Sequence, residues 1–150
     1  MARQSENQMN ENTCFVDSVG WIAILNANDE FHGKVDTEYK KLMESGFHFK
    51  TSTAVLNEVA NALCKPEYRG SVVEFYKRLQ KSHRVEIVFV DEQLWSFGWD
   101  LYENRTDKER SLTDCISVVI MKQESIRDAL TNDKHFVQAG FNAIIRKNKS

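Results

Sequence analysis

Short apolar runs alternate along the chain with longer segments in which apolar residues recur every three or four positions. The short runs predict strands, because each is bounded by turn or helix-start residues. The predicted strands cover residues 13–16 (TCFV), 47–52 (FHFKTS), 85–90 (VEIVFV), 127–131 (RDALT) and 142–146 (NAIIR).

The longer segments predict helices between these strands. They cover residues 19–27, 32–44, 54–65, 71–81, 93–102, 111–121 and 134–139. The third helix is expected to end near Pro66, because proline has no N–H to donate inside a helix. Strands that alternate with helices indicate an α/β fold with a mainly parallel sheet, and ligands bind at the carboxyl edge of such sheets.

Length and composition fit one globular domain. The 150 residues suffice for a single core, and 6 glycines and 1 proline leave no room for flexible linkers. Residues 1–12 are polar and rich in asparagine and glutamine, so they are predicted to form a loose arm ahead of a domain at 13–150.

Charge and cysteine content narrow the possible functions. The net charge is -2, which argues against passive nucleic-acid binding but not against a nuclease, whose bound cations can face phosphate. Three cysteines without CxxC spacing predict neither a disulfide framework nor a structural zinc site. No apolar stretch approaches the roughly 18 residues of a membrane span, and a cytoplasmic location is expected.

Four acidic residues from distant segments are the candidates for chemistry, and we call them the acidic quartet. They are Asp17, directly after the first strand, Glu58, in the helix after the second, Asp114, in the helix before the fourth, and Asp133, directly after the fourth. These carboxylates can converge only in a fold that makes the first, second and fourth strands neighbours.

Each member of the quartet also has an ordinary structural role available. Asp17 and Asp133 could cap helices, at about 1 kcal/mol each, Glu58 could be a solvated helix acid, and Asp114 could complete a capping box with Ser111. Asp114, however, falls on a helix side that it shares with apolar residues, so its carboxylate is expected to be partly buried and to need a partner.

Four carboxylates in one place would repel one another unless cations neutralise them. Oxygen ligands of this kind suit Mg²⁺ or Mn²⁺. The chemistry that uses such a cluster is phosphodiester hydrolysis, in which metal ions activate water and stabilise the developing charge.

Four segments carry a family resemblance. They are FVDSVGWIAILNANDEFH (15–32), TSTAVLNEVANAL (51–63), SLTDCISVVIMK (111–122) and ALTNDKHFVQAGF (129–141). In this order they are similar to the motifs of PIN-domain ribonucleases, particularly the VapC-type toxins of bacterial toxin–antitoxin pairs.

The resemblance implies a three-layer α/β/α fold around a parallel five-stranded sheet. It also implies that the acidic quartet holds one or two Mg²⁺ or Mn²⁺ ions and cleaves RNA. Supporting positions fall on Ser18, Ser111 and Thr131, whose hydroxyl groups could bond an acid or could equally make local caps and turns. The implied partners are an RNA substrate, a small cognate antitoxin and a second copy of the chain.

Other interpretations remain open on sequence grounds. A PIN-like module could bind RNA or protein without cutting, or a PIN nuclease could act in housekeeping without an antitoxin. A receiver domain would use Asp91, but it needs an acidic pair after the first strand, and a haloacid-dehalogenase-type phosphatase would need an acid at Val19. The tryptophans Trp95 and Trp99 are expected in the core, and His32 and His135 are assigned no catalytic role.

Overall fold

The computed structural model describes residues 12–105 and 109–146 and contains a parallel five-stranded sheet in the order β3-β2-β1-β4-β5. The strands are β1 (Thr13–Val16), β2 (His48–Ser52), β3 (Val85–Val88), β4 (Asp128–Leu130) and β5 (Asn142–Ala143). The predicted loose arm, apart from residue 12, lies outside the described residues. The first, second and fourth strands are neighbours, as convergence of the quartet requires.

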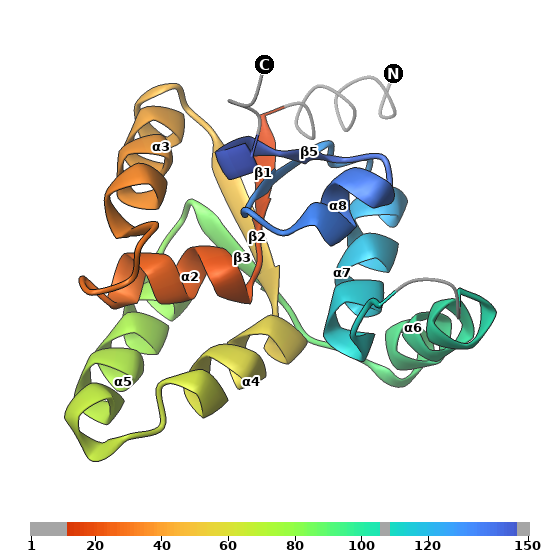
Figure 1. Cartoon of the computed structure of the whole chain (residues 1–150), viewed down its shortest axis with the longest axis horizontal. Helices are drawn as coiled ribbons and strands as arrows, with labels where there is room; N and C mark the ends of the chain where they lie inside the picture. Colours follow the sequence, from red (N-terminus) through yellow and green to blue (C-terminus); the bar gives the residue numbers. More distant parts are fainter. Residues whose placement is uncertain (1–11, 106–108, 147–150) are drawn as a thin grey trace.

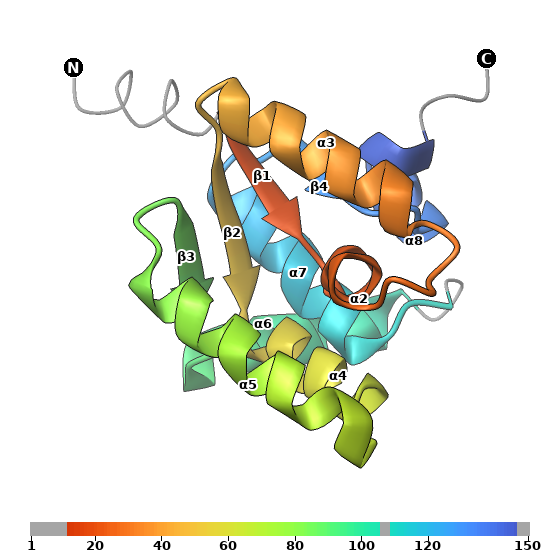
Figure 2. The same ribbon diagram turned by 90° about the vertical axis from the view of Figure 1, so that its left-hand side faces the viewer.

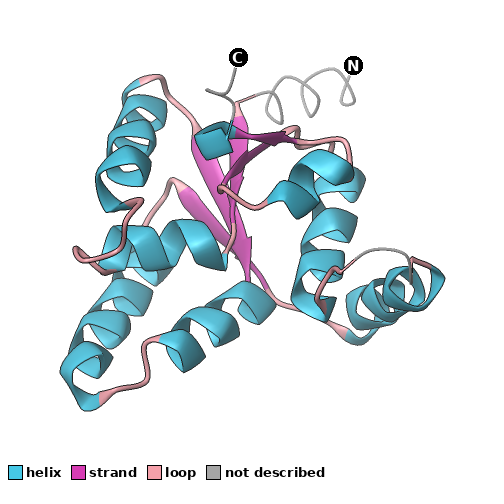
Figure 3. Cartoon of the chain, viewed as in Figure 1, coloured by secondary structure: helices cyan, strands magenta, loops and turns pink. Residues whose placement is uncertain are grey.

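Helices cover both faces of this sheet, which confirms the predicted three-layer α/β/α fold. They are α2 (Ser18–Leu25), α3 (His32–Glu44), α4 (Thr53–Ala62), α5 (Pro66–Lys81), α6 (Glu92–Asn104), α7 (Leu112–Gln123), α8 (Lys134–Gln138) and the 3-10 helix η1 (Ile144–Arg146). Figures 1 and 2 show α2, α3 and α5 on one face and α7, with α6 outside it, on the other. Figure 3 shows the strands as the middle layer. No helix in the described part of the chain combines the length and apolar character that a bilayer crossing requires.

The central helix of the second face, α7, is buried on almost all sides. Cys115 and Ile116 are buried on one side of α7 and Val118 and Met121 on another. This confirms that Asp114, one turn before Val118, lies on a helix side with buried apolar neighbours. A carboxylate in that place is kept from free contact with bulk water.

Two of the boundaries that differ from the sequence predictions are the start of α5 and the end of β5. Pro66 does not merely follow α4 but begins α5, because the first helical position needs no N–H and suits the fixed φ of proline. The helix predicted from residue 71 therefore begins five residues earlier. The fifth strand is only two residues long, and the chain continues as η1 where NAIIR predicted a strand to residue 146. Ile144 and Ile145 are nonetheless buried, so their apolar character reflects the core and not strand pairing.

A close approach of α2 to the sheet depends on Gly20. A Cβ atom at this position would overlap the backbone carbonyl oxygen of Leu130 and lie 3.0 Å from Val16 Cγ1. We therefore expect Gly20→Ala to lower the free energy of unfolding by about 3 kcal/mol, measured by urea denaturation. Gly33→Ala is the matched control, because a Cβ on this α3 residue would meet no atom within 4 Å. Equal stability of the two variants would contradict the expectation.

Candidate active site

Asp17 lies where β1 leaves the sheet. Val16 pairs with Leu130 of β4, so the next residue on each strand, Asp17 and Thr131, emerges beside the other. The Thr131 hydroxyl donates to Asp17 Oδ2 at 2.8 Å. Asp17 Oδ1 accepts the Gly20 N–H at 3.0 Å and thereby caps α2. Asp17 is thus a helix cap, as the structural alternative predicted, and is also fixed from the neighbouring strand.

The Asp17 carboxyl is only 3% exposed, and this burial raises its pKa from 3.8 to about 7. The hydrogen bonds from Gly20 and Thr131 oppose the shift, whereas the negative charges of Asp114 and Asp133 add to it. The ionised form of this carboxyl is therefore destabilised by its surroundings at neutral pH. A cation at the carboxylate would relieve that cost.

Glu58 reaches the same region from α4. This helix begins directly after β2, with Ser52 as its N-cap. The Ser18 hydroxyl, at the start of α2, donates to Glu58 Oε1 at 2.8 Å. Consecutive residues, Asp17 and Ser18, therefore supply one candidate ligand and the orienting partner of another.

Asp114 comes from the first turn of α7. Ser111 caps this helix, and its Oγ accepts the N–H of Asp114 at 3.1 Å, as the capping-box pattern predicted. The carboxylate itself is 16% exposed. Burial, followed by the charges of Asp133 and Glu58, raises the pKa of Asp114, while hydrogen bonding of its carboxyl to the side chain and the backbone of Ser111 lowers it. Helix capping and partial burial of the carboxylate are thus both present.

Asp133 completes the group at the start of α8. Its N–H donates to Thr131 Oγ1 at 3.0 Å, so the same hydroxyl contacts Asp17 and positions Asp133. Asp133 Oδ1 caps α8 by accepting the N–H of His135 at 2.9 Å. The fourth acid is therefore linked to the first through a single side chain, Thr131.

The imidazole of His135 also faces this group, although the sequence interpretation assigned it no role. Its Nδ1 lies 2.8 Å from Asp133 Oδ1 and 3.6 Å from Asp114 Oδ2. The short approach to Asp133 lacks the angle of a hydrogen bond, and Nδ1 has no hydrogen-bond partner among the described residues. The only sequence signal was the spacing Asp133-x-His135 after the fourth strand, which is too common to single out a site.

The acidic quartet therefore meets at the carboxyl edge of the sheet. Electrostatic coupling links Asp17 to Asp114 and Asp133, and it links Asp114 to Glu58. Ligand atoms of Asp114, Asp133 and His135 all lie within 4.8 Å of one another. Three of the four carboxylates, those of Asp17, Glu58 and Asp133, accept hydrogen bonds from hydroxyl or N–H donors. Carboxylate oxygens gathered in this way match the ligands that hard divalent cations prefer. The residues present fit such an ion.

Comparisons with known proteins identify the family of this chain. The PIN domain family profile matches residues 14–142. Two relatives from Mycobacterium tuberculosis, strains CDC 1551 / Oshkosh and ATCC 25618 / H37Rv, are both named 23S rRNA-specific endonuclease VapC20. Each is 33% identical over 131 residues, which cover 85% of this chain and 94% of the relative. A crystal structure of Mycobacterium tuberculosis VapC20, described as a Sarcin-Ricin loop cleaving toxin, superposes with a TM-score of 0.76 at 27% identity, covering 87% of this chain and 98% of that one.

Proposed function

The chain belongs to the PIN domain family, among the VapC-type endonucleases whose members are toxins that cleave RNA, and from this premise we propose that its acidic quartet binds one or two Mg²⁺ or Mn²⁺ ions for RNA hydrolysis. The observation that carries the proposal is the meeting of four acids from separate segments at one sheet edge, with the pKa of two of them raised by burial. A bound ion would supply an activated water and neutralise charge on the phosphate.

The other side chains of the site orient the acids. The Thr131 hydroxyl donates to the Asp17 carboxylate and accepts the backbone N–H of Asp133. The Ser18 hydroxyl donates to the Glu58 carboxylate. Ser111 fixes the start of α7 and thereby the position of Asp114. Because these bonds fix the acids in place, the acids need little rearrangement to bind a cation.

The proposed substrate is based on the RNA substrates named for the relatives. VapC20 is named a 23S rRNA-specific endonuclease, and the similar crystal structure is that of a toxin that cleaves the Sarcin-Ricin loop. We propose that this chain cuts ribosomal RNA at the same kind of exposed loop. Such a substrate places its action in the cytoplasm.

The test is a cleavage assay on a synthetic RNA hairpin with the sarcin–ricin loop sequence. In Mn²⁺ we expect one cut within the loop, no cut in EDTA, and no cut by Asp114→Asn. A hairpin of equal stem and scrambled loop is the control. If the wild-type protein leaves every RNA intact in Mn²⁺ and Mg²⁺, the nuclease proposal fails; if it cuts other RNA but spares the hairpin, only the substrate proposal fails.

A cognate antitoxin follows from the proposal that the chain acts as a toxin. A cell that makes an RNA-cleaving toxin needs an inhibitor produced with it. We expect a short reading frame directly upstream of the gene, and co-expression of its product should abolish the cleavage. A nuclease that stays active with every neighbouring product would be a housekeeping enzyme instead.

We further propose a homodimer, supported by an exposed aromatic ridge on α6 that consists of Trp95, Trp99 and Tyr102. These side chains are between 40% and 48% exposed and contact one another edge to face, with ring centroids 6.2 and 5.4 Å apart. The prediction that Trp95 and Trp99 lie in the core is therefore wrong. The inner side of α6, with Leu94 and Gly98, packs against α7, and the ridge lies outside it.

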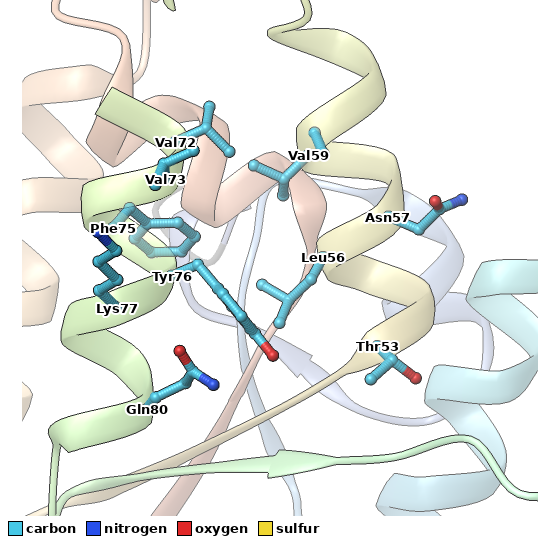
Figure 4. A pocket seen from close by; sticks show the side chains of 11 residues that line it. Thr53, Leu56, Asn57, Val59, Val72, Val73, Phe75, Tyr76, Lys77 and Gln80 are labelled. Atoms are coloured by element: carbon cyan, nitrogen blue, oxygen red, sulfur yellow. The ribbon is translucent and has the colours of Figure 1, made fainter. Parts of the chain in front are cut away.

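An apolar groove between α4 and α5 offers a complementary surface. Figure 4 shows Leu56 and Val59 of α4 opposite Val72 and Tyr76 of α5. The groove between the two helices has a volume of about 610 Å³. The charges of the two surfaces also match, because α6 carries only acids whereas the second half of α5 is basic. The exposed acids are Glu92, Asp100 and Glu103, and the exposed bases are Lys77, Arg78 and Lys81. We place the ridge of one copy against the groove of the other.

Replacing the ridge tests this arrangement. We expect Trp95→Ser/Trp99→Ser to shift the protein from dimer to monomer in analytical ultracentrifugation at micromolar concentration, because it removes the two largest apolar side chains of the ridge. Val137→Ser is the matched control, since Val137 is 50% exposed on α8 and lies outside both surfaces. A wild-type protein that stays monomeric would contradict the proposal.

A further inference from the structure

We propose that His135 is a ligand of the metal ion held by Asp114 and Asp133, and that its nitrogen makes the site prefer Mn²⁺ over Mg²⁺. The inference rests on the proposed function, because it concerns the same ion. It adds an imidazole to a set of ligands that otherwise consists of carboxylates.

The distances around His135 Nδ1 fit neighbouring ligands of one ion. For bonds of about 2.1 Å at right angles, two ligand atoms lie about 3 Å apart. Nδ1 is 2.8 Å from Asp133 Oδ1 and 3.6 Å from Asp114 Oδ2. Two ligand atoms of one ion both point at the ion and not at each other. His135 Nδ1 and Asp133 Oδ1 fit this description, because they lie close together but are not aligned as a hydrogen bond.

The position of the ring is fixed by the fold. Asp133 Oδ1 accepts the backbone N–H of His135 at 2.9 Å, and the ring is 18% exposed at the start of α8. Phe136, the next residue, is buried in the core and anchors the helix. The buried Nδ1 of this imidazole makes no hydrogen bond among the described residues, although two carboxylates lie beside it. The nitrogen is therefore placed to share a cation with those carboxylates.

Nitrogen changes the choice of ion. Mg²⁺ prefers oxygen ligands in near-ideal octahedral geometry, whereas the later first-row divalent metals bind nitrogen more readily. Mn²⁺ accepts both kinds of ligand. Loss of the imidazole should therefore weaken Mn²⁺ binding by at least about tenfold and change Mg²⁺ binding much less.

The decisive experiment is pulsed electron paramagnetic resonance on the full chain, without a polyhistidine tag, loaded with Mn²⁺ alone. We expect a ¹⁴N coupling typical of direct coordination, its replacement by a ¹⁵N signal when only histidine is labelled, and its loss in His135→Gln. His48→Gln is the matched control, because His48 is exposed at the opposite, amino end of β2 and should leave the signal unchanged.

The outcomes separate the two proposals. Wild-type protein that binds Mn²⁺ without a nitrogen coupling, or a His135→Gln variant that loses Mg²⁺ and Mn²⁺ affinity equally, would overturn the role of His135 as a ligand. The wild-type measurement needs no variant, so it stands even if His135→Gln folds poorly. Intact nitrogen coupling in a protein that cleaves no RNA would instead overturn the proposed function alone.

Discussion

Asp17→Asn is expected to abolish RNA cleavage while making the metal-free protein more stable at neutral pH. The substitution removes a carboxylate from the proposed ion site, and we expect the cleavage rate to fall at least about 100-fold. It also removes a negative charge that is buried beside Asp114 and Asp133, so the metal-free variant should unfold at higher urea concentration. Opposite changes in activity and stability are characteristic of a site built for function.

The control for this experiment is Asp36→Asn. Asp36 lies on the surface of α3, paired with Lys40 at 2.9 Å, and its loss should leave both cleavage and stability nearly unchanged. Cleavage should be followed at saturating Mn²⁺ and the stability in EDTA. If Asp17→Asn cleaves at the wild-type rate, Asp17 is not part of the metal site.

Stability of the metal-free protein should decrease as the pH rises from about 4 to about 7. Over this window the folded protein keeps a proton on Asp17, whose pKa is raised from 3.8 to about 7, whereas the unfolded chain has lost it. The free energy of unfolding therefore falls with pH, by on the order of 4 kcal/mol for this group, and levels off above about 7. Burial of Asp114 raises its pKa too and acts in the same direction.

Urea unfolding in EDTA at a series of pH values measures this slope. Asp17→Asn should flatten the curve, and saturating Mn²⁺ should restore more stability at pH 8 than at pH 5, because the ion binds the folded, ionised site. Unfolding free energies that rise through the same window, as for surface carboxylates in ion pairs, would show that Asp17 is not buried as described.

Much of the fold was predictable because the strands have local signals. TCFV is a buried strand at the predicted residues, and α3 begins and ends at the predicted His32 and Glu44. The pairing of the strands could not be predicted from local sequence, since β1 and β4 are more than 100 residues apart along the chain. The contact of Asp17 with Thr131 could be inferred only from the family resemblance. Periodicity alone placed Asp17, Asp114 and Asp133 near the ends of elements and Glu58 inside a helix, without saying which of these positions meet.

The wrong prediction for Trp95 and Trp99 has a physical cause. Aromatic residues on a helix usually face the core, but α6 packs against α7 on one side only, and its aromatic ridge lies outside. His135 was assigned no role because a lone histidine near a helix start is commonly a local hydrogen-bond partner. Its proximity to Asp114, which comes from another helix, could not be seen in the sequence.

The shortness of α8 has a consequence for how an ion enters and leaves. With five residues, Lys134–Gln138, this segment makes little more than one turn and would not persist by itself in water. It carries Asp133 at its cap and His135 in its first turn, whereas Asp17, Glu58 and Asp114 are attached to β1, α4 and α7. Transient unwinding of this one turn, with Phe136 leaving its buried place, would move two of the proposed ligands away at once and leave the other proposed ligands in position. The rate at which a bound cation exchanges with solvent would then depend on the local unwinding of α8. A bound cation would in turn stabilise the helical form of α8.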